Sequence, residues 1–328
     1  MNIKEVARGL SAAIVSLLFF IVLLEVSLQI YTRMFIYYDV EMSRYAAEVK
    51  EKSANPKIGH VHKPNSEAYL MGTDVVINSD GLRDREYPVA RNDKYRIAVL
   101  GDSLTFAWGV DKEDAFEEVL EREISKKHPV EMINFGTGNY NTQQQLNLFK
   151  EKGLKYNPDK VVVFYFINDA ELTPERSKWN ALAWSRGITF FWSRVRGLMS
   201  RMGDSSETFE SFYAGLYEDD QPGFLATRES FLELKEICAE RNIQLQVILL
   251  PELHNLVDYP FVEQYKKVSD FLAANSIDAI DLTADFQGYE NPQELWVAPD
   301  DAHPNALAHG MIAEYSQAFV EQGIINNE

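Results

Sequence analysis

The feature that most constrains the fold is an alternation, from residue 95 onward, of short apolar runs with stretches of helical periodicity. Continuous apolar runs separated by helices are typical of parallel strands covered on both faces. The five expected strands are YRIAVL (95–100), VEMINF (130–135), KVVVFYF (160–166), IQLQVILL (243–250) and IDAIDL (277–282). The pattern predicts an α/β fold of flavodoxin-like architecture, a three-layer α/β/α sandwich with a five-stranded parallel sheet. Ligands of such folds bind beyond the carboxyl ends of the strands.

Helices are expected between these strands, and one segment interrupts the alternation. The expected helices cover 115–127, 142–153, 227–241 and 261–275, and a last helix begins near Pro304. The interruption is an insertion at about 172–222 that is rich in tryptophan and arginine. Insertions of this length are usually lids, binding loops or flexible segments. Contact with a membrane interface or a glycan is one interpretation, and an ordinary amphipathic helical hairpin is another.

The N-terminus carries the apolar run GLSAAIVSLLFFIVLL, which continues past Glu25 through VSLQIYT to Arg33. Roughly 20 residues of helix cross the hydrocarbon core of a bilayer. Lys4 and Arg8 precede the run, which by the positive-inside rule predicts a cytoplasmic N-terminus. A cleaved signal peptide is the alternative, but its apolar segment is usually shorter and followed by small residues. We therefore expect a single-pass anchor, with the chain after about residue 33 on the periplasmic or outer face.

The expected domain organisation has three parts, namely the tip and anchor (1–33), an accessory segment (34–94) and the sheet domain (95–328). Within the accessory segment, 37–57 is charged and helical in pattern and is interpreted as a stalk. Residues 58–88 contain short alternating stretches punctuated by glycine and proline, which predict a small β element.

Composition narrows the function classes. The chain has 32 basic and 50 acidic residues and a net charge of -18, which repels a phosphate backbone, so nucleic acid is not an expected partner. The single cysteine, Cys238, excludes an internal disulfide and a multi-cysteine metal site. His60 and His62 lack a third ligand at a recognisable spacing, so no metal site is predicted.

A serine and a histidine stand where nucleophilic catalysis needs them. The first expected strand leads into Gly101-Asp102-Ser103, which places a hydroxyl at the carboxyl end of a central strand, although a serine there also often caps a helix. Near the C-terminus, Asp300 and His303 stand three residues apart. A serine hydroxyl becomes nucleophilic when an imidazole accepts its proton and a carboxylate orients that imidazole.

Each of the two partners of the serine has a neighbouring alternative. Asp301 is the alternative to Asp300, and His309 is the alternative to His303. His309 falls inside the expected last helix, which favours a core or surface role for it.

Two further strand ends carry candidate donors for an oxyanion. The second strand leads into a turn, Gly136-Thr137-Gly138-Asn139, whose backbone amides would face the cleft. The third strand leads into Asn168, whose side-chain amide would do the same. Taken alone, the first is equally a plain strand-to-helix turn and the second a helix cap.

Four such elements at the strand ends of one sheet resemble the SGNH (GDSL-like) hydrolase family, whose first block reads GDS and whose last reads DxxH. The resemblance runs from about Tyr95 to the C-terminus. It implies Ser103 as nucleophile and first oxyanion donor, Asn168 as another donor, His303 as base and Asp300 as its orienting carboxylate.

This sequence departs from the family pattern at two glycines. Asn139 stands where the second block has glycine, with Gly138 just before it, so either backbone N–H is a candidate donor. Phe166 replaces the glycine that often precedes the block III asparagine by two residues, and we expect it to narrow the cleft.

The resemblance implies an esterase without metal or cofactor. The chain is similar to family members that combine an N-terminal anchor with the DGLRDREYP and GDSLTFAWGV arrangement. This similarity implies a bacterial envelope protein. The expected substrate is an O-acyl or O-acetyl ester on an acylated carbohydrate or another small ester. Two alternatives are an O-acyltransferase with the same triad and a non-catalytic, glycan-binding scaffold on a hydrolase fold.

Overall fold

The computed structural model describes residues 3–173, 185, 187–192, 194–195 and 208–324. The chain divides into two compact units. The smaller unit comprises Met1–Ala47 and Ser177–Ser205, and the larger comprises Glu48–Arg176 and Ser206–Glu328. Trp179 and Trp184, which dominate the expected insertion, lie outside the described residues.

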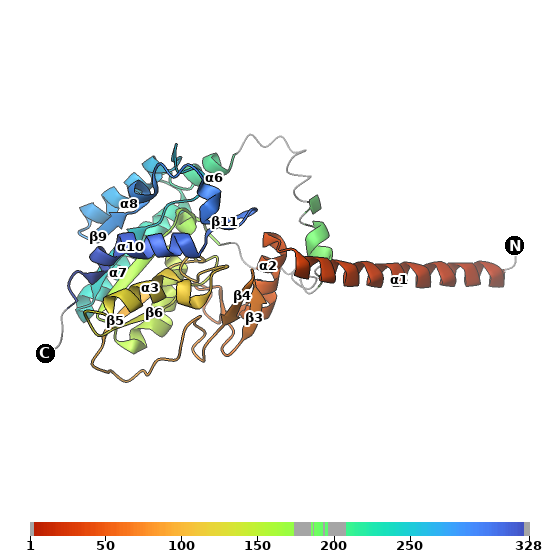
Figure 1. The fold of residues 1–328 in the computed structure, drawn as a ribbon, viewed down its shortest axis with the longest axis horizontal. Coiled ribbons are helices and arrows are strands. Elements are labelled where there is room, and N and C mark those ends of the chain that lie inside the picture. The colour runs from red at the N-terminus through yellow and green to blue at the C-terminus, as the bar shows by residue number, and fades with distance from the viewer. Residues whose placement is uncertain (1–2, 174–184, 186, 193, 196–207, 325–328) are drawn as a thin grey trace. The chain divides into compact units, whose positions relative to one another are not determined.

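The larger unit is built on a five-stranded sheet, as the alternating pattern predicts (Figure 1). The strands are β5 (Tyr95–Leu100), β6 (Val130–Asn134), β7 (Lys160–Tyr165), β8 (Gln244–Leu249) and β9 (Asp278–Asp281). Their order is β6-β5-β7-β8-β9, and every neighbouring pair is parallel. The α/β class and the strand count are confirmed. The strand order reverses between β5 and β7, and doubly wound sheets bind ligands at this switch point.

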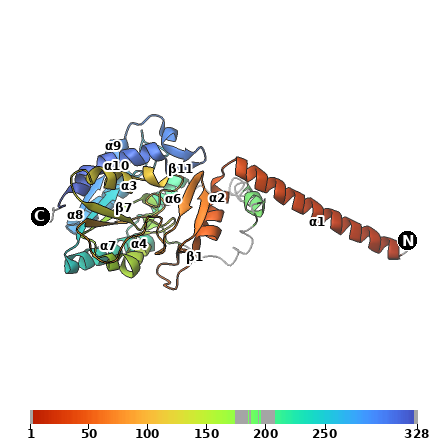
Figure 2. The same ribbon diagram turned by 60° about the horizontal axis from the view of Figure 1, so that its bottom comes forward.

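Helices cover both faces of this sheet. They are α3 (Phe116–Ile124), α4 (Thr142–Leu148), α7 (Pro222–Arg241), α8 (Val262–Ala274) and α10 (Ala306–Glu321), with the shorter α6 (Phe209–Gly215) and α9 (Thr283–Phe286). Helices α3 and α10 pack together on one face and α4 and α7 together on the other (Figure 2). These are the three layers that the sequence predicts.

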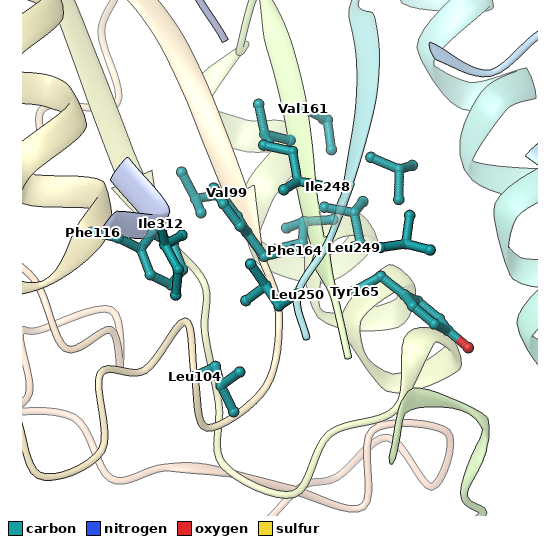
Figure 3. Close-up of a cluster of buried hydrophobic side chains, with 14 of the residues drawn as sticks. Val99, Leu104, Phe116, Val161, Phe164, Tyr165, Ile248, Leu249, Leu250 and Ile312 are labelled. Atoms are coloured by element: carbon teal, nitrogen blue, oxygen red, sulfur yellow. The ribbon is translucent and has the colours of Figure 1, made fainter. Parts of the chain in front are cut away.

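The core lies between sheet and helices. Figure 3 shows Phe116 of α3 and Ile312 of α10 side by side near Val99 of β5. Val161 and Ile248, from β7 and β8, are fully buried in the same cluster. Burying each such side chain stabilises the fold by about 1.5–3 kcal/mol. Both faces of the central strands are covered by helices. Continuous runs of β-branched apolar residues therefore suit these strands.

Two helix boundaries differ from expectation. Helix α7 begins at Pro222, ahead of the expected 227, because proline is favoured in a first helical turn. The last helix begins at Ala306, since the Asn305 side chain accepts from the N–H of Ala308 and caps it. Pro304 instead ends β11 (Asp301–Pro304), which pairs antiparallel with β10 (Trp296–Ala298).

The accessory segment contains two antiparallel strand pairs. Strand β1 (Lys50–Lys52) pairs with β2 (His60–His62), and β3 (Glu67–Leu70) pairs with β4 (Thr73–Val76). The β element is confirmed, but the stalk interpretation is wrong for 50–52. Lys50 is only 6% exposed and lies in a strand, because its ammonium group finds acceptors inside the larger unit.

The smaller unit contains helix α1 (Ile3–Met34) and α2 (Tyr38–Arg44). From Lys4 to Tyr31, α1 is long and apolar enough to cross a membrane, and its side chains are not buried by protein. The Glu25 carboxylate within this helix accepts hydrogen bonds from the Ser185 hydroxyl (2.7 Å), the Gly187 N–H (3.1 Å) and Gln29 (3.1 Å). Such partners offset the cost of a carboxylate on an apolar helix.

Cys238 lies on α7 and is 2% exposed. Burial raises the pKa of its thiol to about 12, so it stays protonated and serves as a small apolar core group.

Candidate active site

Ser103 follows β5 on a tight turn. The N–H of Phe106 donates to the carbonyl of Asp102 (2.9 Å), and the N–H of Trp108 donates to the carbonyl of Ser103 (3.1 Å). Gly101 opens the turn for reasons of space, since a Cβ there would lie 1.9 Å from the Thr105 hydroxyl. The turn thus presents the Ser103 side chain, 7% exposed, at the carboxyl end of the sheet.

His303 meets Ser103 across two hundred positions of sequence. The serine Oγ lies 2.8 Å from His303 Nε2, and His303 Nδ1 lies 2.5 Å from Asp301 Oδ1. With Nδ1 protonated and donating to the carboxylate, Nε2 carries the lone pair that can accept the hydroxyl proton. This is the geometry that base-assisted nucleophilic attack requires.

The carboxylate at His303 is Asp301, so the expectation of Asp300 is wrong on position. Asp301 and His303 both lie in β11, and residues two apart in a strand face the same side. Asp300 precedes the strand and is exposed. Asp300 was expected from the DxxH pattern on a loop, whereas the short β10–β11 hairpin places Asp301 on the same side of the strand as His303.

Asp301 is held from a second direction by Trp108, which the sequence reasoning missed. The indole Nε1–H donates to Asp301 Oδ2 at 2.9 Å, and Trp108 is 2% exposed. Burial alone would raise the pKa of Asp301, but hydrogen bonds from His303 and Trp108 outweigh it and lower that pKa. The carboxylate is therefore ionised and fixed in orientation. A tryptophan five residues after the serine was the available sequence signal.

The turn after β6 carries Asn139 in the left-handed region, at φ 66°. Asparagine adopts this conformation more readily than other non-glycine residues, which explains how it stands where the family pattern has glycine. Two residues before Gly138, Gly136 permits the close approach of this turn to the serine turn, because a Cβ there would lie 2.4 Å from the Phe106 nitrogen.

The carbonyl of Gly138 accepts hydrogen bonds from two side chains of the accessory segment. Lys50 Nζ donates to it at 2.6 Å and also contacts Asn139 Oδ1 at 3.0 Å. His60 Nε2 lies 3.0 Å from the same carbonyl oxygen and must donate, since that oxygen only accepts. A trans peptide directs its C=O and N–H oppositely, so the N–H of Asn139 points away from Lys50 and His60.

A small hollow lies beside the two candidate donor residues. Its volume is about 80 Å³, and its lining among the described residues is Asn139, Tyr140, Asn168, Glu171 and Thr173. Asn168 lies on the short 3₁₀ turn Ile167–Ala170 that follows β7. The family-pattern departure at Phe166 does not narrow this hollow, because that side chain packs against the hydrophobic core.

Asn168 also faces Asp102. Burial raises the pKa of Asp102, and hydrogen bonds from the Leu104 N–H (2.9 Å) and from the Asn168 side chain oppose that rise. The Oδ1 of Asn168 is buried and has no hydrogen-bond partner within the described residues. An amide nitrogen carries two N–H donors, so one remains for another acceptor.

Arg83, also in the accessory segment, hydrogen-bonds to the backbone of the serine turn. The Arg83 guanidinium donates to the carbonyls of Phe106 (2.9 Å), Ala107 (2.5 Å) and Val110 (2.8 Å). Ala107 has φ 59°, a costly conformation for alanine. The buried guanidinium thus supplies donors to three carbonyls of this turn, of which that of Ala107 also accepts from the Val110 N–H at 3.1 Å.

His309, the alternative base, lies in α10 and is fully buried. Its Nδ1 accepts the N–H of Phe116 at 3.0 Å, and its ring stacks on the Phe116 ring. Burial lowers the pKa of His309 to about 3, so it is a neutral core group away from Ser103. Within the described ranges, no group of three or more histidine, cysteine, aspartate or glutamate side chains is arranged to hold a metal ion.

Comparison with known proteins adds to this geometry. The profile of the GDSL-like Lipase/Acylhydrolase family matches residues 99–311, more than half of the chain. No curated protein has a significant sequence match to the chain.

Several solved structures are similar to the chain. A lipolytic protein of the G-D-S-L family from Desulfitobacterium hafniense is 14% identical, with a TM-score of 0.45, and the match covers 69% of this chain and 99% of that one. A lipase/acylhydrolase from Enterococcus faecalis is 18% identical, with a TM-score of 0.45 and coverage of 71% and 99%. The acetyl xylan esterase AlAXEase is 17% identical, with a TM-score of 0.42 and coverage of 69% and 99%.

Proposed function

Since the chain belongs to the GDSL-like lipase/acylhydrolase family and is an ester-hydrolysing enzyme, we propose that it cleaves short O-acyl esters through Ser103, His303 and Asp301. The observation that carries the proposal is the continuous relay from the Ser103 hydroxyl through the His303 ring to Asp301. His303 takes the serine proton as Oγ attacks the acyl carbonyl. It then returns the proton to the leaving alcohol, and water repeats the sequence on the acyl-enzyme.

Three groups are assigned to the oxyanion, namely the backbone N–H of Ser103, the backbone N–H of Asn139 and the remaining Asn168 N–H. Asn139 is preferred to Gly138 because Asn139 lines the hollow and its peptide is fixed by Lys50 and His60. Preorganised donors of this kind stabilise the developing negative charge without reorienting during the reaction.

The size and lining of the hollow favour a short acyl group. Its volume of about 80 Å³ is well below the about 300–1,000 Å³ of sites for drug-sized ligands. The five described lining residues all carry polar groups, which suits a small O-acyl group among hydroxyls, as on an envelope glycan.

The proposed location follows from the apolar helix α1. Lys4 and Arg8 at its start favour a cytoplasmic N-terminus. The larger unit would then lie outside the cytoplasm, where acylated envelope glycans occur.

The test uses the full-length protein in detergent with 4-nitrophenyl acetate. Ser103→Ala should lower kcat by about 10⁴-fold or more while leaving the melting temperature close to that of the wild type. Ser125→Ala, at an exposed serine after α3, is the matched control and should stay fully active. Undiminished activity in Ser103→Ala would refute the proposal. Adding a glycan acceptor and analysing the products separates hydrolysis from acyl transfer.

A further inference from the structure

Glu171 lines the hollow and carries a carboxyl group that the proposed triad and oxyanion donors do not use. Glu171 is anchored through its backbone, since its N–H donates to the Asn168 carbonyl (2.8 Å) and its carbonyl accepts from Asn141 Nδ2 (3.0 Å). The ends of β6 and β7 therefore both fix its position. Within the part of the chain that the structure describes, its carboxyl group has no hydrogen-bond or ion-pair partner.

The place of the hollow relative to the reacting atoms indicates which half of an ester enters it. His303 Nε2 returns the proton to the leaving alcohol, so the alcohol lies on the histidine side of Ser103. The hollow is lined by the oxyanion residues Asn139 and Asn168, and His303 is not among its described lining residues. An acyl group whose carbonyl oxygen points at the proposed donors Asn139 and Asn168 would therefore be the part of the substrate nearer to Glu171.

We infer that this hollow is the acyl subsite and that Glu171 sets its charge preference, favouring short cationic acyl groups such as aminoacyl over neutral ones and rejecting anionic ones such as malonyl. The inference rests on the proposed esterase function. Glu171 is half-buried, and burial raises its pKa. In such a setting a charge acts on a neighbouring charge more strongly than it does in water.

Three esters of one fluorogenic phenol test the inference, namely glycyl (cationic), propionyl (neutral) and the larger malonyl (anionic). The enzyme-free rate of each is subtracted, and kcat/KM is compared between Glu171→Gln and wild type for each ester. This ratio cancels the different intrinsic reactivities of the three esters. Removing the charge should lower kcat/KM about tenfold for the glycyl ester and raise it about tenfold for the malonyl ester, with little change for the propionyl ester.

Two further variants keep the result interpretable. Glu171→Asp retains the charge and should keep the wild-type order of preference. Glu229→Gln removes an exposed carboxylate on α7 and should leave all three ratios near one. Opposite changes for the cation and the anion do not arise from general damage to the fold.

The outcomes separate this inference from the function on which it depends. If the wild type hydrolyses the propionyl ester and Glu171→Gln changes all three esters by the same factor, the charge preference is overturned and the esterase proposal stands. If the wild type hydrolyses none of the three, the proposed function itself fails.

Discussion

The two sides of Ser103 are supported in different ways. On the histidine side, Asp301 is fixed by Trp108, which lies five residues after the serine on the same turn. On the oxyanion side, the Gly138 carbonyl is fixed by Lys50 and His60, which belong to the accessory segment and lie outside the family match at 99–311. The proposed proton relay thus lies within the sheet domain, whereas the proposed oxyanion peptide is held by residues of the accessory segment that precedes it.

This difference suggests that the accessory segment is part of the catalytic apparatus. Asp301 and His303 hydrogen-bond through their side chains, and the serine turn and the β10–β11 hairpin are enough to bring these side chains together. A single backbone N–H has no side chain to orient it, so its direction depends on what holds the carbonyl of the same peptide. Four variants test this comparison.

The largest effect is expected on the histidine side, at Asp301. Asp301→Asn removes the carboxylate that fixes the His303 tautomer, so kcat should fall by about 10²–10⁴-fold. Asp300→Asn, the neighbouring control, should leave kcat unchanged because Asp300 is exposed. Initial rates on 4-nitrophenyl acetate measure both. The reverse ranking would restore Asp300 as the orienting residue.

On the oxyanion side, Lys50→Met removes the ammonium that grips the Gly138 carbonyl while keeping a side chain of similar length. We expect kcat to fall about tenfold, less than for outright loss of an oxyanion donor, with KM and melting temperature little changed. Lys52→Met, exposed on the same strand β1, is the control. A rise in KM at constant kcat would instead indicate a substrate-binding role for Lys50.

A smaller effect is expected at Trp108. Trp108→Phe keeps an aromatic ring but removes the donor to Asp301 Oδ2. Since His303 still donates to Asp301, only part of the about 1.5–3 kcal/mol of a hydrogen bond to a charged group should be lost in the transition state, so kcat should fall about fivefold. Trp192→Phe makes the same chemical change at an exposed tryptophan. If Trp108→Phe equals wild type in kcat, the histidine side needs no support beyond the hairpin.

The smallest effect on activity, and a distinct effect on stability, is expected at His309. Its pKa is lowered to about 3 in the folded protein, whereas an unfolded histidine has a pKa of about 6.5. As pH falls below about 6.5 the unfolded state gains a proton that the folded state does not take up, so stability is lost progressively down to about pH 3. His309→Gln should keep its activity at neutral pH and show a shallower decline of melting temperature over that window. Parallel declines in the two proteins would contradict the assignment.

The sequence predicted the parts of the molecule in which side-chain pattern decides structure. The strands were found because both faces of the sheet are covered, which leaves continuous apolar runs. Ser103 and His303 were found because each follows or accompanies a recognisable motif. Asp300 was expected in place of Asp301 because strands as short as those of the β10–β11 hairpin show no detectable alternation of apolar and polar residues.

Contacts made through the backbone were not readable. Lys50 and His60 bind a carbonyl some eighty positions away, and no property of a lysine in the segment KEK or of a histidine in HVH distinguishes such a role from solvent exposure. The role of Arg83 could not be predicted either, since its acceptors are three main-chain carbonyls. Every residue has a backbone carbonyl, so a contact with one leaves no pattern in a single sequence.

The burial of Cys238 has a practical consequence. The sequence has one cysteine, and that thiol is enclosed and protonated, so maleimides should pass over the native protein. A cysteine introduced at an exposed position would then be the single reactive label. Placed at Glu5, in the first turn of α1, or at Lys57, after that helix, it would report with a membrane-impermeant reagent which end of the helix faces the outside of an intact cell.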